Sequence, residues 1–231
     1  MKEHQTENKH DGEANSIWCK ICGITSAADA VMVEQAGADA IGLNFFASSP
    51  RFVTLNQAAA IAQAVSLTKV GLFVDAAPNV VEESMAACQL DLLQFHGDES
   101  PDYCAQFGMP YMKVLRVGRA AENARQILSF VDSYADGWAC LLDAFVEGQR
   151  GGTGKLLDRA LWPQNARSKL ILAGGLNPQN VGDAILQLSP HGVDVSSGVE
   201  HIVGGKRQAG KKDEQAVRQF ISEVNDAAEQ R

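Results

Sequence analysis

Cys22 is the first residue of this chain whose type and position could carry chemistry. It ends an apolar run over residues 17–22 and is followed by Gly23, a pattern typical of a β-strand that turns into a helix. In an α/β barrel the active site lies at the carboxyl ends of the strands. A thiol at such an end could act as a nucleophile or, as its thiolate, as a base.

Cys19 stands three residues before Cys22, a spacing shared with zinc and disulfide motifs. Residues three apart in a strand face opposite sides of the sheet, so the two sulfurs should diverge. No second pair of cysteines or histidines completes a tetrahedral zinc set. We therefore expect no metal site, and we expect Cys19 to be a core residue.

Asp143 closes another apolar run, over residues 138–142, and should reach the same end of the structure. A carboxyl group there could serve as a general acid, although an aspartate at a strand end is as often a helix cap or a solvated loop residue. The run leads into a long loop whose glycine cluster could close near a ligand. The cluster contributes Gly152, Thr153 and Gly154, without the spacing of a P-loop.

Two glycine-rich segments follow the apolar runs 169–173 and 192–195. Their candidate phosphate-binding residues are Gly174, Gly175, Ser196, Ser197 and Gly198. Glycine lets backbone N–H groups approach a phosphate closely, and barrel enzymes often bind phosphate after strands seven and eight. The segments predict a phosphate site, with two ordinary glycine-rich turns as the alternative.

Two further polar side chains come at the ends of expected strands. Arg51 follows the run 40–45 and could form a bidentate pair with a carboxylate, or it could be a solvated surface charge. His96 follows the run 90–95 and is as suited to a structural hydrogen bond as to a ligand contact.

Strand-like and helix-like segments alternate from residue 17 to the end of the chain. The expected strands are 17–22, 40–45, 69–74, 90–95, 111–117, 137–142, 169–173 and 192–195. The expected helices are 27–36, 55–65, 79–88, 100–107, 121–130, 156–161, 178–188 and 213–228. Eight of each in alternation predict an α/β fold with a single (β/α)8 TIM barrel, and a doubly wound sheet is the competitor.

Composition limits the classes of binding partner and the cellular compartment that we expect for this chain. The 231 residues carry a formal charge of −8, which argues against nucleic acid or an anionic membrane as partner. No apolar run is long enough to span a bilayer. Polar residues 1–16 predict a disordered tail without a secretory signal, before a barrel domain over 17–231. Five cysteines, an odd number, suit a reducing cytoplasm, and monomer or homodimer stays undecided.

Eight segments together resemble phosphoribosylanthranilate isomerase, an enzyme of tryptophan biosynthesis. They are residues 20–25 (KICGIT), 49–53 (SPRFV), 71–75 (GLFVD), 93–97 (LQFHG), 141–143 (LLD), 151–154 (GGTG), 172–181 (LAGGLNPQNV) and 193–200 (VDVSSGVE). The resemblance implies an Amadori rearrangement of N-(5-phosphoribosyl)anthranilate, a phosphorylated small molecule. It implies no cofactor, because the substrate nitrogen acts as the electron sink.

The same resemblance implies roles for individual residues. Asp143 would be the acid, Cys22 the base, and Arg51 the contact to the substrate carboxylate. Asp194 could orient substrate hydroxyls. An ordinary thiol is mostly neutral near pH 7, so Cys22 would need nearby positive potential, and Lys20 lies on the same face of the expected strand.

Two other functions stay open at this point. One is another phosphate-binding barrel enzyme, such as an indole-glycerol-phosphate synthase, which would use lysine and glutamate at strand ends. The other is a non-catalytic barrel that binds phosphorylated metabolites. Residues 201–212 also depart from the family pattern, which has a short proline-containing link. We expect this basic segment to be a loop, either a solvated one or a mobile electrostatic funnel.

Overall fold

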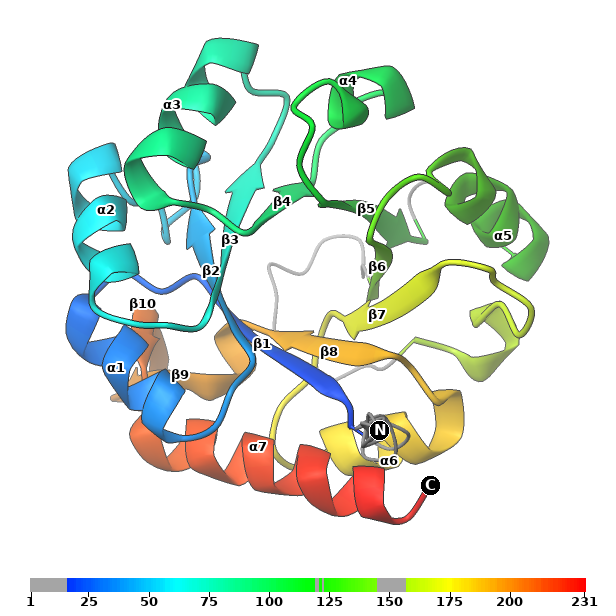
Figure 1. The fold of residues 1–231 in the computed structure, drawn as a ribbon. Coiled ribbons are helices and arrows are strands. Elements are labelled where there is room, and N and C mark those ends of the chain that lie inside the picture. Colours follow the sequence, from blue (N-terminus) through cyan, green and yellow to red (C-terminus); the bar gives the residue numbers. More distant parts are fainter. Residues whose placement is uncertain (1–15, 119–120, 122, 145–156) are drawn as a thin grey trace, which may run out of the picture.

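The computed structural model describes residues 16–118, 121, 123–144 and 157–231. Eight parallel strands close into one barrel, which confirms the expected fold, and Figure 1 looks along it with the helices outside the strands. The strands are β1 (Trp18–Cys22), β2 (Ala40–Asn44), β3 (Thr68–Phe73), β4 (Leu92–Phe95), β5 (Tyr111–Val117), β6 (Ala139–Ala144), β7 (Lys169–Ala173) and β8 (Gly192–Val195).

Seven α-helices connect the strands or close the chain within the described residues. They are α1 (Ala27–Gln35), α2 (Leu55–Gln63), α3 (Pro78–Cys88), α4 (Pro101–Ala105), α5 (Ala124–Ser133), α6 (Val181–Leu188) and α7 (Glu214–Glu229). Polar caps set several of their starts: the side chains of Ser26, Thr54 and Ser100 each accept a hydrogen bond from a backbone N–H in the first turn.

The helix expected over 156–161 is wrong. The described part of that segment forms only a 3₁₀ turn, η1 (Arg159–Leu161). Pro163 follows immediately and disfavours the helical conformation at Trp162, which is extended. Four other helices begin later than expected. Helix α4 starts after its N-cap Ser100, α5 after Asn123 and α7 after Asp213, and α6 starts only after the turn that precedes Asn180.

Alternation along the strands separates two apolar layers. Inside the barrel lies a cluster built from small and branched residues, with Trp18 and Trp138 packed against it. Between the strands and the helices lies a larger core that contains Cys19 and Ile21. Cys22 instead lines the cavity at the carboxyl end, so the two sulfurs diverge as expected.

Residues 200–212 form an antiparallel hairpin, β9 (Glu200–Val203) and β10 (Lys206–Lys212), so the loop expected there is wrong. Gly204 and Gly205 make the two-residue turn, and both have positive φ, as a type I′ hairpin requires. A Gly-Gly pair after two β-branched residues is itself a hairpin signal. No helix in the described part of the chain has the length and apolar character needed to cross a membrane.

Candidate active site

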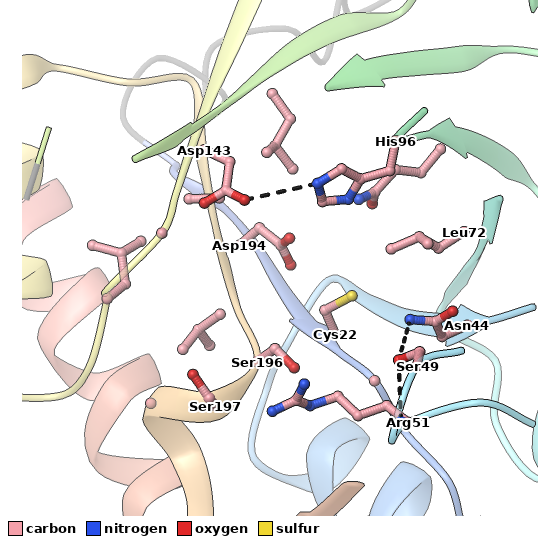
Figure 2. Close-up of a pocket in the computed structure, with 18 of the residues that line it drawn as sticks. Cys22, Asn44, Ser49, Arg51, Leu72, His96, Asp143, Asp194, Ser196 and Ser197 are labelled. Atoms are coloured by element: carbon pink, nitrogen blue, oxygen red, sulfur yellow. Dashed lines mark hydrogen bonds and ion pairs between the residues drawn. The ribbon is translucent and has the colours of Figure 1, made fainter. Parts of the chain in front are cut away.

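A cavity of about 390 Å³ opens at the carboxyl ends of the strands. It is lined by every described residue that the sequence nominated: Cys22, Arg51, His96, Asp143, Gly174, Gly175, Asp194, Ser196, Ser197 and Gly198. Gly152, Thr153 and Gly154 lie outside the described residues. Figure 2 shows Asp143 and Cys22 on opposite sides of this cavity, with Asp194 between them.

Cys22 ends β1 with its side chain toward the cavity and only 6% of its surface exposed. Burial raises the pKa of the thiol, and the charge of Lys20 opposes this rise. Both groups lie against Gly42 on β2: a Cβ there would come 2.7 Å from Cys22 Sγ and 3.2 Å from Lys20 Nζ. Gly42 therefore provides the space in which the thiol and the ammonium meet.

Lys20 is fully buried inside the barrel, one layer below Cys22. Its Nζ lies 2.8 Å from Oδ1 of Asp194 on the adjacent strand β8, at the position paired with Lys20 in the sheet. Burial alone would lower the pKa of Lys20, but Asp194 and Cys22 raise it above its ordinary value. Lys20 is thus a permanent cation beside the thiol, as the strand parity indicated.

Asp143 near the end of β6 has the electrostatics of a proton donor. Burial and the charge of Asp194 raise its pKa to about 6, and Arg116 partly opposes them. His96 Nε2 lies 3.7 Å from Asp143 Oδ2. Burial and the charges of Arg116 and Lys20 lower the pKa of His96 to about 3, so the imidazole is neutral near pH 7. His96 therefore adds no positive charge that would ionise Asp143.

Arg116 is a cavity residue that sequence reasoning missed. It lies on β5, at the position paired with Asp143 in β6, and its Nη2 donates to the carbonyl of His96 at 3.3 Å. The expected strand 111–117 already contained it. Arg116 has the same strand parity as Met112 and Val114, which lie inside the barrel, so alternation along the strand places it at the inner rim.

Arg51 is held by a partner that sequence reasoning also missed. Its Nε and Nη2 donate to the two carboxylate oxygens of Glu200, at 2.6 and 2.8 Å. The guanidinium lies toward Ser196 and Ser197 in Figure 2. Its side chain crosses Gly23, where a Cβ would come 2.5 Å from Arg51 Cδ. A bidentate pairing of Arg51 with a carboxylate thus occurs within the protein, and Nη1 has no hydrogen-bond partner among the described residues.

The glycine-rich segments after β7 and β8 pack too closely for side chains. Gly174 has φ +86°, and a Cβ there would come 2.5 Å from Asp143 Oδ1. A Cβ at Gly198 would overlap the carbonyl oxygen of Leu176. The side-chain amide of Asn180 donates to the carbonyl of Gly175 at 3.0 Å, which fixes the first segment. Bare backbone therefore faces this side of the cavity, as phosphate binding requires.

Two buried side-chain atoms that line the cavity, Gln94 Oε1 and Ser196 Oγ, have no hydrogen-bond partner among the described residues. Asp194 also lines the cavity, with its Oδ1 against Lys20 Nζ beneath it. Buried polar groups are rarely left unpaired without reason. The position of Gln94 Oε1 and Ser196 Oγ indicates a site built for a polar ligand.

Comparison with known proteins gives a consistent result. A family model described as N-(5'phosphoribosyl)anthranilate (PRA) isomerase matches residues 19–223. The N-(5'-phosphoribosyl)anthranilate isomerase of Pseudomonas fluorescens strain Pf0-1 is 47% identical over 212 residues, covering 91% of this chain and 99% of the relative. Phosphoribosyl anthranilate isomerase from Thermotoga maritima superposes with a TM-score of 0.80 at 31% identity, covering 91% of this chain and 99% of that one.

A further similar structure is that of phosphoribosyl anthranilate isomerase in complex with reduced 1-(o-carboxyphenylamino)-1-deoxyribulose 5-phosphate. It matches with a TM-score of 0.76 at 31% identity, covering 91% of this chain and 99% of that one.

Proposed function

The chain belongs to the N-(5'-phosphoribosyl)anthranilate isomerase family, and on that premise we propose that it catalyses an Amadori rearrangement in tryptophan biosynthesis. The substrate is N-(5-phosphoribosyl)anthranilate, and the product is 1-(2-carboxyphenylamino)-1-deoxyribulose 5-phosphate. The observation that carries the proposal is the pair formed by Asp143 and Cys22. A carboxyl with a raised pKa and a thiol face each other across one cavity.

Asp143 acts first, as the general acid. It gives its proton to the ribose ring oxygen while the bond between that oxygen and C1′ breaks. The lone pair of the anthranilate nitrogen forms a C=N bond to C1′, so the ring opens to an iminium. A pKa of about 6 leaves a usable fraction of Asp143 protonated near neutral pH and still lets the proton leave.

Cys22 acts second, as the general base. The thiolate removes the proton from C2′, whose acidity the iminium raises. The C–H electrons form the C1′=C2′ bond of an enolamine, and the C=N π electrons return to the anthranilate nitrogen. Tautomerisation of that enolamine gives the ketone. Because burial raises the pKa of the thiol, Cys22 needs Lys20 and the positive iminium to reach the thiolate form. This requirement orders the steps: ring opening comes before proton removal.

The other cavity residues position the substrate in this proposal. The backbone after β7 and β8 and the hydroxyls of Ser196 and Ser197 receive the phosphate. Arg51 receives the anthranilate carboxylate through Nη1, the nitrogen that Glu200 leaves free. Asp194, at the centre of the cavity, accepts hydrogen bonds from ribose hydroxyls.

The two alternatives fit the cavity less well. An indole-glycerol-phosphate synthase would need lysine and glutamate at the strand ends, whereas the described residues that line the cavity include neither. A non-catalytic barrel has no need of a carboxyl held near pKa 6 opposite a thiol. We further propose a cytoplasmic location, which suits five cysteines that are all free and buried.

A turnover assay tests the function directly. Purified protein should convert N-(5-phosphoribosyl)anthranilate to the aminodeoxyribulose phosphate, with the product identified by its ketone, because an isomerisation leaves the mass unchanged. Protein that binds the substrate without converting it would support the non-catalytic alternative. Formation of an indole from the aminodeoxyribulose phosphate would support the synthase.

A further inference from the structure

Three charged groups meet at the rim between β1, β2 and β8, and the proposed mechanism uses only one of them. Arg51 is partly buried, Glu200 is 4% exposed and Lys212 is 5% exposed. Glu200 accepts both hydrogen bonds of the Arg51 pair, and Lys212 Nζ lies 3.5 Å from Glu200 Oε1. Removing charges from water costs free energy, so a buried cluster of three charged groups is expected to serve a function.

The contacts of Lys212 and Glu200 lead to the phosphate side of the cavity and to the turn after Cys22. Lys212 Nζ donates to the carbonyl of Ser196 at 3.1 Å, and the N–H of Gly210 donates to Glu200 Oε1 at 2.8 Å. Thr25, in the turn between β1 and α1, donates from Oγ1 to the carbonyl of Gly210 at 2.7 Å. The hairpin is therefore fastened to the β1–α1 turn that follows Cys22.

The balance of charge in the cluster is positive. Arg51 and Lys212 contribute one positive charge each and Glu200 one negative charge, so the net charge of the three groups is +1. Without Lys212 the Arg51–Glu200 pair would be neutral as a unit. The substrate of the proposed function carries both a phosphate and a carboxylate, so a neutral cluster would attract it far less.

We propose that Glu200 and Lys212 are positioning residues that adapt this rim to a doubly anionic substrate. Glu200 fixes the direction of the Arg51 guanidinium, and Lys212 supplies the charge that Glu200 would otherwise cancel. Neither side chain lines the cavity; they act through Arg51 and through the Ser196 carbonyl. This inference rests on the proposed function for the identity of the two anionic groups.

The ionisation of Lys212 fits this role and provides a second readout. Burial lowers its pKa to about 8, while Glu200 and Cys22 oppose the decrease and Arg51 adds to it. Asp29 of α1 also faces this residue, because its carboxylate accepts the N–H of Lys212 at 3.1 Å. An anion bound at the phosphate side would raise the pKa of Lys212, so binding above pH 8 should take up a proton.

The test compares two buried changes with one exposed control. Lys212→Met removes the added charge but leaves Glu200 paired with Arg51. Glu200→Gln keeps an acceptor for the N–H of Gly210. The control is the double variant Lys206→Met/Arg207→Met, because both residues are exposed on the same hairpin. Calorimetric titration with ribose 5-phosphate and with anthranilate measures the affinity for each half of the substrate in the absence of turnover.

Lys212→Met should lower the affinity for ribose 5-phosphate about 10-fold. It should raise KM for the full substrate by a similar factor, with a much smaller change in kcat. Lys212→Arg should restore most of the affinity. Glu200→Gln should lower the affinity for anthranilate several-fold, because the Arg51 guanidinium loses its fixed direction. This decrease is expected although the substitution makes the cluster more positive. A charge effect alone would have the opposite sign, so tighter anthranilate binding by Glu200→Gln overturns the role of Glu200.

The role of Lys212 fails if Lys212→Met matches the wild type or the control in ribose 5-phosphate affinity and only its melting temperature falls. Wild-type protein offers a readout that no folding defect can obscure. Proton uptake on binding ribose 5-phosphate should appear above about pH 8, and its absence overturns the proposal. Wild-type protein that fails to isomerise the substrate, with these affinity changes intact, refutes the proposed function and leaves this inference standing.

Discussion

Lys20 Nζ and Asp194 Oδ1 lie 2.8 Å apart where β1 pairs with β8, with Asp194 lining the cavity and Lys20 beneath it. The two charges act on the acid and the base in different ways. Lys20 favours the thiolate of Cys22, whereas Asp194 favours the protonated form of Asp143. Each member of the ion pair therefore favours the ionisation state that one proposed role requires, while Asp194 also raises the pKa of Cys22.

Lys20→Met should lower kcat more than it changes KM. Without the ammonium, burial and Asp194 both raise the pKa of Cys22, so less thiolate is available. We expect a decrease of about 10- to 100-fold, from the loss of one or two pKa units of stabilisation. The pH dependence of Cys22 alkylation should shift upward in the variant. An unshifted alkylation profile contradicts the role of Lys20.

Cys22→Ala should keep the fold and the affinity for ribose 5-phosphate but lose about 10²- to 10⁴-fold in kcat, the range for one general base. The matched control is Cys19→Ala, which removes a thiol from the outer core and leaves the cavity intact. Steady-state kinetics on both variants separates the two thiols. Near-normal turnover by Cys22→Ala would remove this residue from the mechanism.

Asp143→Asn keeps the shape of the acid without its proton and should lower kcat by about 10²- to 10⁴-fold. In the wild type, kcat/KM should fall as the pH rises above about 6, because the protonated carboxyl is lost. The residual activity of the variant should lack this decrease. A variant with raised KM and unchanged kcat would make Asp143 a binding residue.

The same substitution should stabilise the protein at neutral pH. A carboxyl whose pKa is raised in the fold contributes fully to stability below its unfolded pKa near ~4. That contribution is lost as the pH rises through about 6, where the buried group ionises. The asparagine of Asp143→Asn never ionises. The melting temperature of the variant should therefore exceed that of the wild type at about pH 7 and match it at about pH 4. Equal melting temperatures at both pH values contradict the raised pKa.

Gly42→Ala should impair catalysis from a position that carries no functional group. Its Cβ would come 2.7 Å from Cys22 Sγ, so the thiol must move. We expect kcat to fall by about 10-fold or more, with about 1–3 kcal/mol of destabilisation from overpacking. Gly182→Ala is the control, because a Cβ in that helix meets no atom nearer than 3.7 Å. A fully active Gly42→Ala variant would show that the Cys22 thiol does not need the space that Gly42 leaves.

Local patterns were enough to predict most of the barrel and the described candidate site residues. The expected strand starts and ends lie close to the observed ones, because apolar runs, glycines and polar turns determine strand boundaries through the nearest few residues. The hairpin over 200–212 was missed although Gly204 and Gly205 signal it, because a family pattern suggested a link. The turn at Arg159–Leu161 was missed because the apolar residues suggested a helix, whereas Pro163 disfavours the helical conformation at the residue before it.

The sequence by itself determined that Cys22 and Asp143 share one face, because parallel strands closed in a barrel end at a common rim. Only the tertiary structure decided the partners across that rim. Arg51 and Glu200 are separated by 149 residues, and no local pattern joins them. The pairing of Lys20 with Asp194 depends on the register between the first and last strands. Such contacts, and the pKa values that burial and neighbouring charges create, exist only after the barrel closes.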